Sequence, residues 1–274
     1  MRLHPILGAL LFAFSGVLVL AALPLFAPDT APGFAIVMGF AIEFFLGMLA
    51  IAFSSLSGPG VFRRLGLGPS RIPWKTTLVL VVGTLLLSFV LNGVYELSGF
   101  GDEGALAQLE SDLSGVGGWT IAVAVVSFAL APGIAEELLF RGLIQRGLHS
   151  RVGPVASVGV AALLFGALHV DPVYALLTAV LGAYLGAITL IGGSIRPSIV
   201  CHSCNNLVAV LAAVWGLNID ANGAGGATSL VAALVLAATA LGWAWHSLGG
   251  LPVAVSSREN TLVGLQPGSG SDDP

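Results

Sequence analysis

The chain has 274 residues, of which 56% are hydrophobic and only 9% are charged, and its mean hydropathy is +0.97. Soluble domains are nearer half apolar and a quarter charged, so this composition indicates an integral membrane protein. The formal net charge of −4, without any basic cluster, gives no sign of a nucleic-acid partner.

Apolar segments recur along the whole chain, and a helix that spans a bilayer needs about 20 such residues. They predict an all-α fold, a polytopic membrane helix bundle of about eight transmembrane helices. These helices are predicted at about residues 6–26, 34–54, 76–97, 119–135 with a continuation to about 149, 154–170, 173–191, 197–215 and 228–248. The first segment could instead be a signal peptide, but its length favours an uncleaved helix.

The composition changes near residue 252, where the chain becomes polar and rich in Gly, Ser and Asp. We therefore predict one integral membrane domain over residues 1–251 and a disordered cytoplasmic tail over residues 252–274. The 37 glycines suit close packing of helices in lipid.

The loop charges predict the orientation of the helices, because Lys and Arg concentrate on the cytoplasmic side. If the number of helices is even, all of the basic loop residues lie on the same side of the membrane: Arg2, Arg63, Arg64, Arg71, Lys75, Arg146, Arg151, Arg196 and Arg258. The opposite loops contain acidic residues and no Lys or Arg: Asp29, Asp102, Glu103, Glu110, Asp112 and Asp220. This partition predicts a multi-pass protein of the cell membrane with both termini in the cytoplasm.

A few ionisable or amide side chains fall inside the apolar segments, where such groups are costly and usually functional. They are Glu43, Glu136, Glu137, Arg141, His169, His202 and Asn206. Glu137 and Arg141 are four residues apart, so on a helix they share one face and can form an ion pair. Glu136 is rotated from that face by about 100°, which leaves it as a second, unpaired carboxylate.

The remaining polar groups come from two later segments. His202 and Asn206 are also four apart and should project from one helix face. His169 ends an apolar run, just before Asp171 and Pro172, which read as a helix cap and first turn. A single histidine at such a depth is commonly a packing residue. Histidines with a carboxylate can instead bind a metal or activate water, and an amide can stabilise an oxyanion.

These residues form three ordered motifs: Glu136 and Glu137 with Arg141, Phe165 with His169, and His202 with Asn206. In this order, on successive helices, they resemble the CPBP family of intramembrane proteases. That family includes the CAAX prenyl endopeptidases of the Ras-converting type and bacterial abortive-infection and bacteriocin-processing relatives. The motifs occupy about residues 119–215, the core region of the family.

The resemblance implies a role for each motif residue. Glu136 would be the general base that activates water, with Glu137 and Arg141 supporting it. His169 would help to bind the water or a metal, while His202 and Asn206 would stabilise the tetrahedral oxyanion. The activity implied is hydrolysis of a peptide bond in a membrane-associated or lipidated substrate. A divalent metal such as zinc could be held by Glu136, His169 and His202, and a metal-free glutamate mechanism is the alternative.

Two other functions are compatible with these residues. The protein could be a non-catalytic membrane scaffold or a bacteriocin-immunity-type protein that keeps the same fold. Buried Glu, Arg and His also occur along ion paths of transporters, but the sequence lacks the inverted repeat that many transporters have. The sequence names neither the substrate nor an oligomeric state, and the role of Glu43 stays open.

Overall fold

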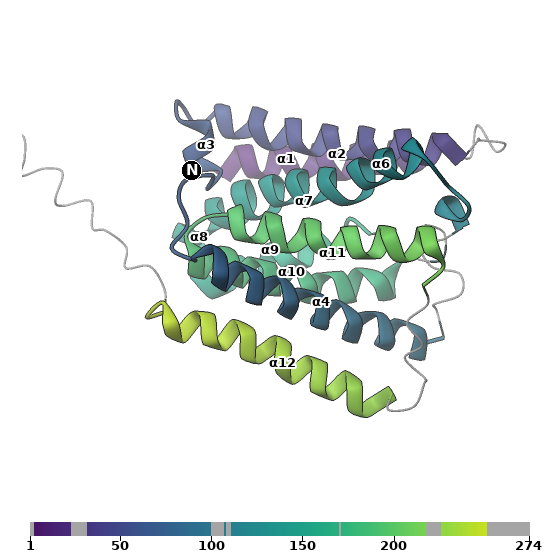
Figure 1. The fold of residues 1–274 in the computed structure, drawn as a ribbon. Coiled ribbons are helices and arrows are strands. Elements are labelled where there is room, and N and C mark those ends of the chain that lie inside the picture. The colour runs from purple at the N-terminus through teal and green to yellow at the C-terminus, as the bar shows by residue number, and fades with distance from the viewer. Residues whose placement is uncertain are drawn as a thin grey trace, which may run out of the picture.

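The protein is a bundle of roughly parallel and antiparallel helices (Figure 1). The computed structural model describes residues 3–22, 32–99, 107, 111–169, 171–217 and 226–250. Its elements are α1 (Leu3–Ala22), α2 (Pro32–Ser55), α3 (Val61–Arg64), α4 (Trp74–Leu97), α6 (Trp119–Val125), η3 (Val126–Leu130), α7 (Ala131–Glu136), η4 (Glu137–Gln145), α8 (Arg146–Val152), α9 (Pro154–Gly166), α10 (Pro172–Gly192), α11 (Arg196–Trp215) and α12 (Gly226–Ser247). The predicted all-α, polytopic class is confirmed, and the predicted tail at 252–274 lies outside the described residues.

Six helices of the described part of the chain are long and apolar enough to cross a membrane. They are Ile36–Ser55, Trp74–Leu97, Trp119–Val152, Pro172–Gly192, Arg196–Trp215 and Gly226–Ser247. The first predicted helix is α1, Leu3–Ala22, which contains the apolar segment Ile6–Gly16, and the fifth is the shorter apolar helix Pro154–Gly166. A helix of 13 residues rises only about 20 Å, which is less than the hydrocarbon thickness of about 30 Å. The chain is therefore a multi-pass membrane protein, and the predicted number of eight spans is not confirmed.

The helix over residues 119–152 is continuous but irregular, because two π-helical segments, η3 and η4, interrupt the α-helix. Pro132 follows η3 and has no N–H to donate, so the regular hydrogen-bond ladder cannot continue through this turn. The second π-segment, Glu137–Gln145, contains the predicted ion pair. Such π-segments in a helix are frequent at functional sites.

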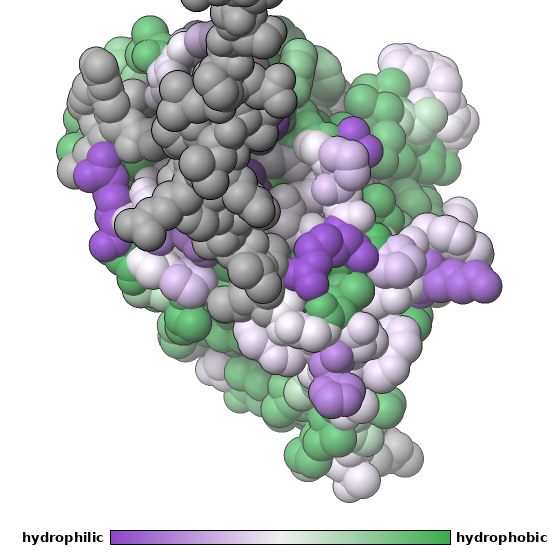
Figure 2. All heavy atoms as spheres, turned by 90° about the vertical axis from the view of Figure 1, so that its left-hand side faces the viewer, coloured by the Kyte–Doolittle hydropathy of each residue, from purple (hydrophilic) through white to green (hydrophobic). Residues whose placement is uncertain are grey.

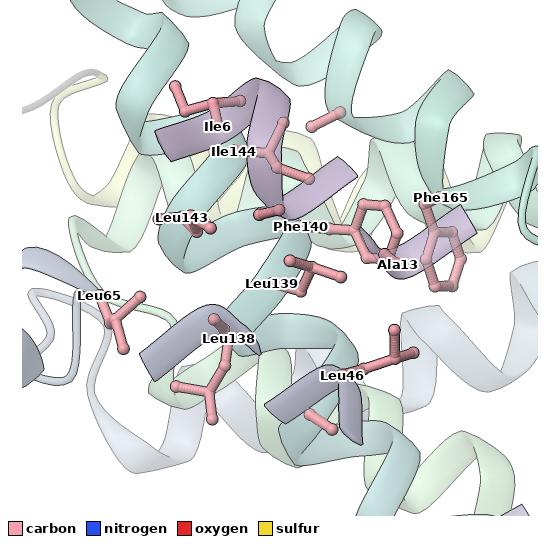
Figure 3. Packing of buried hydrophobic residues seen from close by; sticks show 14 of the residues in the cluster. Ile6, Ala13, Leu46, Leu65, Leu138, Leu139, Phe140, Leu143, Ile144 and Phe165 are labelled. Atoms are coloured by element: carbon pink, nitrogen blue, oxygen red, sulfur yellow. The ribbon is translucent and has the colours of Figure 1, made fainter. Parts of the chain in front are cut away.

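The centre of the bundle is formed by the 119–152 helix and α10, in which 56% and 61% of an apolar 18-residue stretch is buried. By contrast, only 22% of the α12 span is buried, and α12 packs on α4 at the edge (Figure 1). Figure 3 shows the apolar cluster between α2, η4 and α9, where Leu139, Phe140 and Leu143 are fully buried. Lipid is as apolar as these side chains, so dense packing stabilises the cluster more than escape from water does.

Small residues let the helices that bear the predicted site approach each other closely. A Cβ at Gly133 would lie 2.1 Å from Ser203 Oγ and 2.9 Å from its backbone, so α7 and α11 touch there. A Cβ at Gly166 would lie 2.2 Å from the carbonyl oxygen of Ala175, which brings α9 equally close to α10. These contacts hold the segments around Glu136, His169 and His202 against one another.

The described loop cations gather at one end of the bundle, on the left of Figure 1. We call this the basic end; its residues are Arg63, Arg64, Arg71, Lys75, Arg146, Arg151 and Arg196. Arg146 donates to the carbonyls of Arg64 (3.2 Å) and Gly193 (3.1 Å), and Arg71 donates to Leu248 O (2.5 Å). Figure 2 looks onto this end, where hydrophilic side chains lie among apolar ones. α1 begins and α12 ends here, as an even number of crossings requires (Figure 1).

Candidate active site

A cavity of about 220 Å³ lies inside the bundle, between α2, α4, α7, α9, α10 and α11. It is lined by Glu43, Ser88, Leu91, Asn92, Pro132, Glu136, Phe165, His169, Tyr174, Leu177, Thr178, Leu181, His202, Asn205 and Asn206. The lining thus includes four of the six predicted catalytic residues. This volume is enough for several water molecules, and the lining offers them polar partners.

The other two predicted residues, Glu137 and Arg141, form a buried ion pair beside the cavity. Arg141 Nη1 lies 2.8 Å from Glu137 Oε1, and the side chains are 1% and 0% exposed. Arg141 also donates to the carbonyl of Gly182 on α10 (3.0 Å), and its guanidinium lies 4.5 Å from the ring centre of Phe165 on α9. The pair predicted from the spacing is present, and it connects the 119–152 helix to two neighbouring helices.

His202 lies between the two consecutive carboxylates. Its Nδ1 is 3.1 Å from Glu137 Oε1, and its Nε2 is 3.5 Å from Glu136 Oε2. Glu137 Oε1, which pairs with Arg141, accepts a hydrogen bond from Nδ1, and this contact favours the tautomer with the proton on that nitrogen. Nε2 of that tautomer faces Glu136.

His169 lies in a turn and not on the helix that the sequence predicted over residues 154–170. α9 ends at Gly166, and the backbone N–H of His169 donates to the Gly166 carbonyl (2.9 Å). The following helix begins at Pro172, and Asp171 caps it by accepting from the N–H groups of Val173 (2.8 Å) and Tyr174 (2.9 Å). Pro172 keeps the residue before it, Asp171, out of the helical conformation, and the predicted cap is confirmed.

The His169 ring is held from several sides. Its Nδ1 lies 3.3 Å from the carbonyl oxygen of Phe165 and 3.5 Å from Thr178 Oγ1. The ring packs edge-on against Phe165 (5.5 Å between centres) and Tyr174 (5.3 Å). Asp171, which lies outside the membrane-spanning helices, accepts a hydrogen bond from Tyr95 at the end of α4. This bond connects the turn that contains His169 to α4. The bond from Tyr95 lowers the pKa of Asp171 most, and the bond from the Tyr174 N–H lowers it further.

Asn206 lines the cavity one helical turn after His202, as the spacing predicted. Asn205 Nδ2 donates to Asn206 Oδ1 (3.3 Å), so the carbonyl oxygen of Asn206 is occupied. The amide nitrogen of Asn206 is then the group with which it can donate to a reacting oxygen.

Several polar lining residues were not assigned from the sequence: Ser88, Asn92, Tyr174, Thr178 and Asn205. Ser88 and Asn92 are four residues apart in an apolar helix. This spacing could have predicted from the sequence that one face of α4 meets a polar space. Glu43 was recognised as an intramembrane carboxyl group, but only the structure places it in the same cavity as Glu136.

Within the described residues, no group of three or more His, Cys, Asp or Glu side chains is arranged to hold a metal ion. Glu136 and His202 lie together, and Nδ1 of His169 contacts Phe165 and Thr178, which leaves Nε2 as the ring nitrogen that could face a ligand. As the described side chains lie, Glu136, His169 and His202 are not grouped as a zinc site. We assign no step to a metal, and zinc binding stays a prediction.

Comparison with known families identifies the segment that carries this geometry. Residues 118–208 match the family model described as type II CAAX prenyl endopeptidase Rce1-like. The matched segment, 91 of the 274 residues, is similar to that family. It runs from the start of α6 into α11 and contains Glu136, Glu137, Arg141, His169, His202 and Asn206, which confirms the resemblance inferred from the motifs. The chain matches no curated protein and no solved structure.

Proposed function

We propose that this protein is an intramembrane endopeptidase in which Glu136 acts as general base on water. The observation that carries the proposal is the convergence of Glu136, His169, His202 and Asn206 on one cavity, since all four residues lie in the segment that matches the Rce1-like family model. These residues come from three separate segments of the chain, and a purely structural role would not require all of them to face one polar space.

The proposed reaction begins with a water molecule held between Glu136 and His169. Glu136 removes a proton while the water oxygen attacks the carbonyl carbon of the scissile peptide bond. The carbonyl oxygen becomes an oxyanion, which the amide N–H of Asn206 stabilises together with His202. Glu137 fixes the orientation of His202, and Arg141 holds Glu137 in place.

The family description suggests the substrate class, a prenylated protein or peptide with a C-terminal CAAX sequence. A lipidated peptide suits a cavity enclosed by membrane-spanning helices, because its lipid chain would partition into the bilayer beside the bundle. The lining from α4 and α10 alternates polar and apolar side chains, which suits an extended peptide with hydrophobic residues.

The test uses the purified protein in detergent with a farnesylated CAAX peptide and the same peptide without the farnesyl group. We expect release of the C-terminal tripeptide, measured by mass spectrometry, from the farnesylated peptide. As a matched control, Trp243→Leu changes an exposed residue of α12, far along the chain from the site, and should retain the activity. No cleavage of any membrane-anchored peptide, together with a cellular phenotype that survives Glu136→Gln, would favour the non-catalytic scaffold instead.

We also propose that the basic end faces the cytoplasm of a cell membrane. Support comes from the clustering of Arg63, Arg71 and the other described loop cations at one end, since such residues concentrate in cytoplasmic loops. When Cys201 and Cys204 are replaced by serine, labelling of a cysteine introduced at exposed Arg196 should then require a membrane-permeant reagent in intact cells.

A further inference from the structure

Peptide hydrolysis needs two proton transfers, and the roles proposed above supply only the first. After Glu136 has taken a proton from water, the leaving amine must still receive one, because an amide anion is a very poor leaving group. We propose that Glu43, on α2, is a catalytic residue that donates this proton as the general acid. This inference rests on the proposed peptidase function and adds a residue outside the segment matched by the family model.

Close packing of α2 against α7 brings Glu43 to the cavity. A Cβ at Gly47, one turn after Glu43, would lie 3.5 Å from the Cβ of Ala135, the residue before Glu136. Glu43 lines the same cavity as Glu136, is 9% exposed, and interacts electrostatically with Glu136. Its Oε2 is a buried atom without a hydrogen-bond partner among the described residues. A buried carboxyl oxygen that no donor contacts favours the neutral acid over the carboxylate, because nothing compensates the charge of the ionised form.

The surroundings of Glu43 suit a proton donor. The cationic groups beside the cavity are engaged elsewhere, since Arg141 pairs with Glu137 and His202 lies between Glu137 and Glu136. No ion pair involves Glu43 within the described part of the chain. A carboxylate enclosed without a cation is costly, whereas the neutral acid carries an O–H that can be donated. The other titratable groups that line the cavity are Glu136, His169, His202 and Tyr174.

The complete reaction balances with two carboxyl groups in different roles. Glu136 accepts a proton from water, and the water oxygen forms a bond to the carbonyl carbon. As the tetrahedral intermediate collapses, the C–N bond breaks and the nitrogen takes the proton of Glu43. The products are a carboxylic acid and an amine, and the proton on Glu136 passes through cavity water to Glu43, which restores both groups. Two carboxyl groups whose surroundings differ commonly divide acid and base work in this way.

The test compares two farnesylated substrates that differ only in the leaving group: the normal peptide and a thioester at the scissile bond. A thiolate leaves without a proton, so only the peptide needs the general acid. For Glu43→Gln we expect kcat on the peptide to fall by about 10²–10⁴-fold, with the thioester rate within about threefold of the unmodified protein. Glu136→Gln should reduce both rates, because the attack of water precedes either departure. Phe44→Leu, the neighbouring residue on the exposed face of α2, should change neither rate.

The ratio of the peptide rate to the thioester rate is measured on one sample, so it does not depend on the fraction of protein that folds. Equal losses on both substrates, or a peptide rate within about threefold of the unmodified protein, would overturn the role of Glu43. Glu43→Asp keeps the acid and should recover part of the peptide rate. Failure of the proposed function looks different: the unmodified protein would cleave neither substrate, or Glu136→Gln would cleave both.

Discussion

Replacing Arg141 by methionine should be among the most destabilising single changes at the site. The guanidinium is 1% exposed and makes an ion pair with Glu137 (2.8 Å), a hydrogen bond to Gly182 (3.0 Å) and a ring contact with Phe165 (4.5 Å). Without it, the carboxylate of Glu137 would be fully buried with no cation paired to it, and its remaining partners would be Nδ1 of His202 and the side chain of Ser198.

Breaking a buried ion pair by removing one partner costs about 3–5 kcal/mol. For a chain of this size each kcal/mol changes the Tm by roughly 2–4 °C, so the loss should be about 10 °C. The assay is thermal unfolding of the purified protein in detergent. Arg196→Met, at an exposed arginine of the basic end, is the matched control and should cost less than about 0.5 kcal/mol.

A double variant separates the charge effect from simple loss of packing. Glu137→Gln with Arg141→Met removes both charges and keeps an oxygen that can accept from His202, so it should recover much of the stability lost in Arg141→Met. The reasoning is wrong if Arg141→Met lowers the Tm no more than Arg196→Met does, or if the double variant loses the sum of the two single effects.

Three further variants test other parts of the structure. Gly133→Val should destabilise by about 1–3 kcal/mol or prevent folding, because its side chain would overlap Ser203; Gly159→Val, in open space on α9, is the control for thermal unfolding. Asn206→Ala should lower kcat by about 10²–10³-fold with little change in KM if the amide stabilises the oxyanion, and an unchanged kcat would refute that role. The lowered pKa of Asp171 means that its stabilisation is present above its ordinary pKa of about 3.9 and is lost as the pH falls through the lower folded-state pKa. Asp171→Asn should therefore flatten the acid side of the Tm–pH curve, and an unaltered curve would refute this.

The sequence indicated which residues belong to the candidate site better than it indicated how they connect in three dimensions. Polar residues in apolar helices are costly, so Glu136, Glu137, Arg141 and His202 stood out against their surroundings. The i, i+4 spacing also predicted the Glu137–Arg141 pair, which forms although this segment is π-helical, because residues four apart remain neighbours there. Local spacing and composition were sufficient for these inferences.

Contacts between distant segments could not be read from spacing. His202 bridges both carboxylates only because Gly133 lets α7 and α11 touch, and this depends on how two helices pack. The place of Glu43 depends in the same way on the contact of Gly47 with Ala135. The Asp171–Pro172 pair correctly indicated the start of the next helix. The predicted helix over 154–170 was too long, because α9 ends at Gly166 and His169 lies in the turn between the two helices.

The most direct test of the proposed mechanism is the rate of cleavage of the farnesylated CAAX peptide by Glu136→Gln under saturating substrate. Glutamine has nearly the same shape as glutamate and cannot accept the proton of water, so folding and substrate binding should be preserved. The proposed mechanism predicts a fall in kcat of about 10²–10⁴-fold with the Tm unchanged. A well-folded Glu136→Gln protein that cleaves the peptide within about threefold of the original rate would contradict the assignment of Glu136 as the general base.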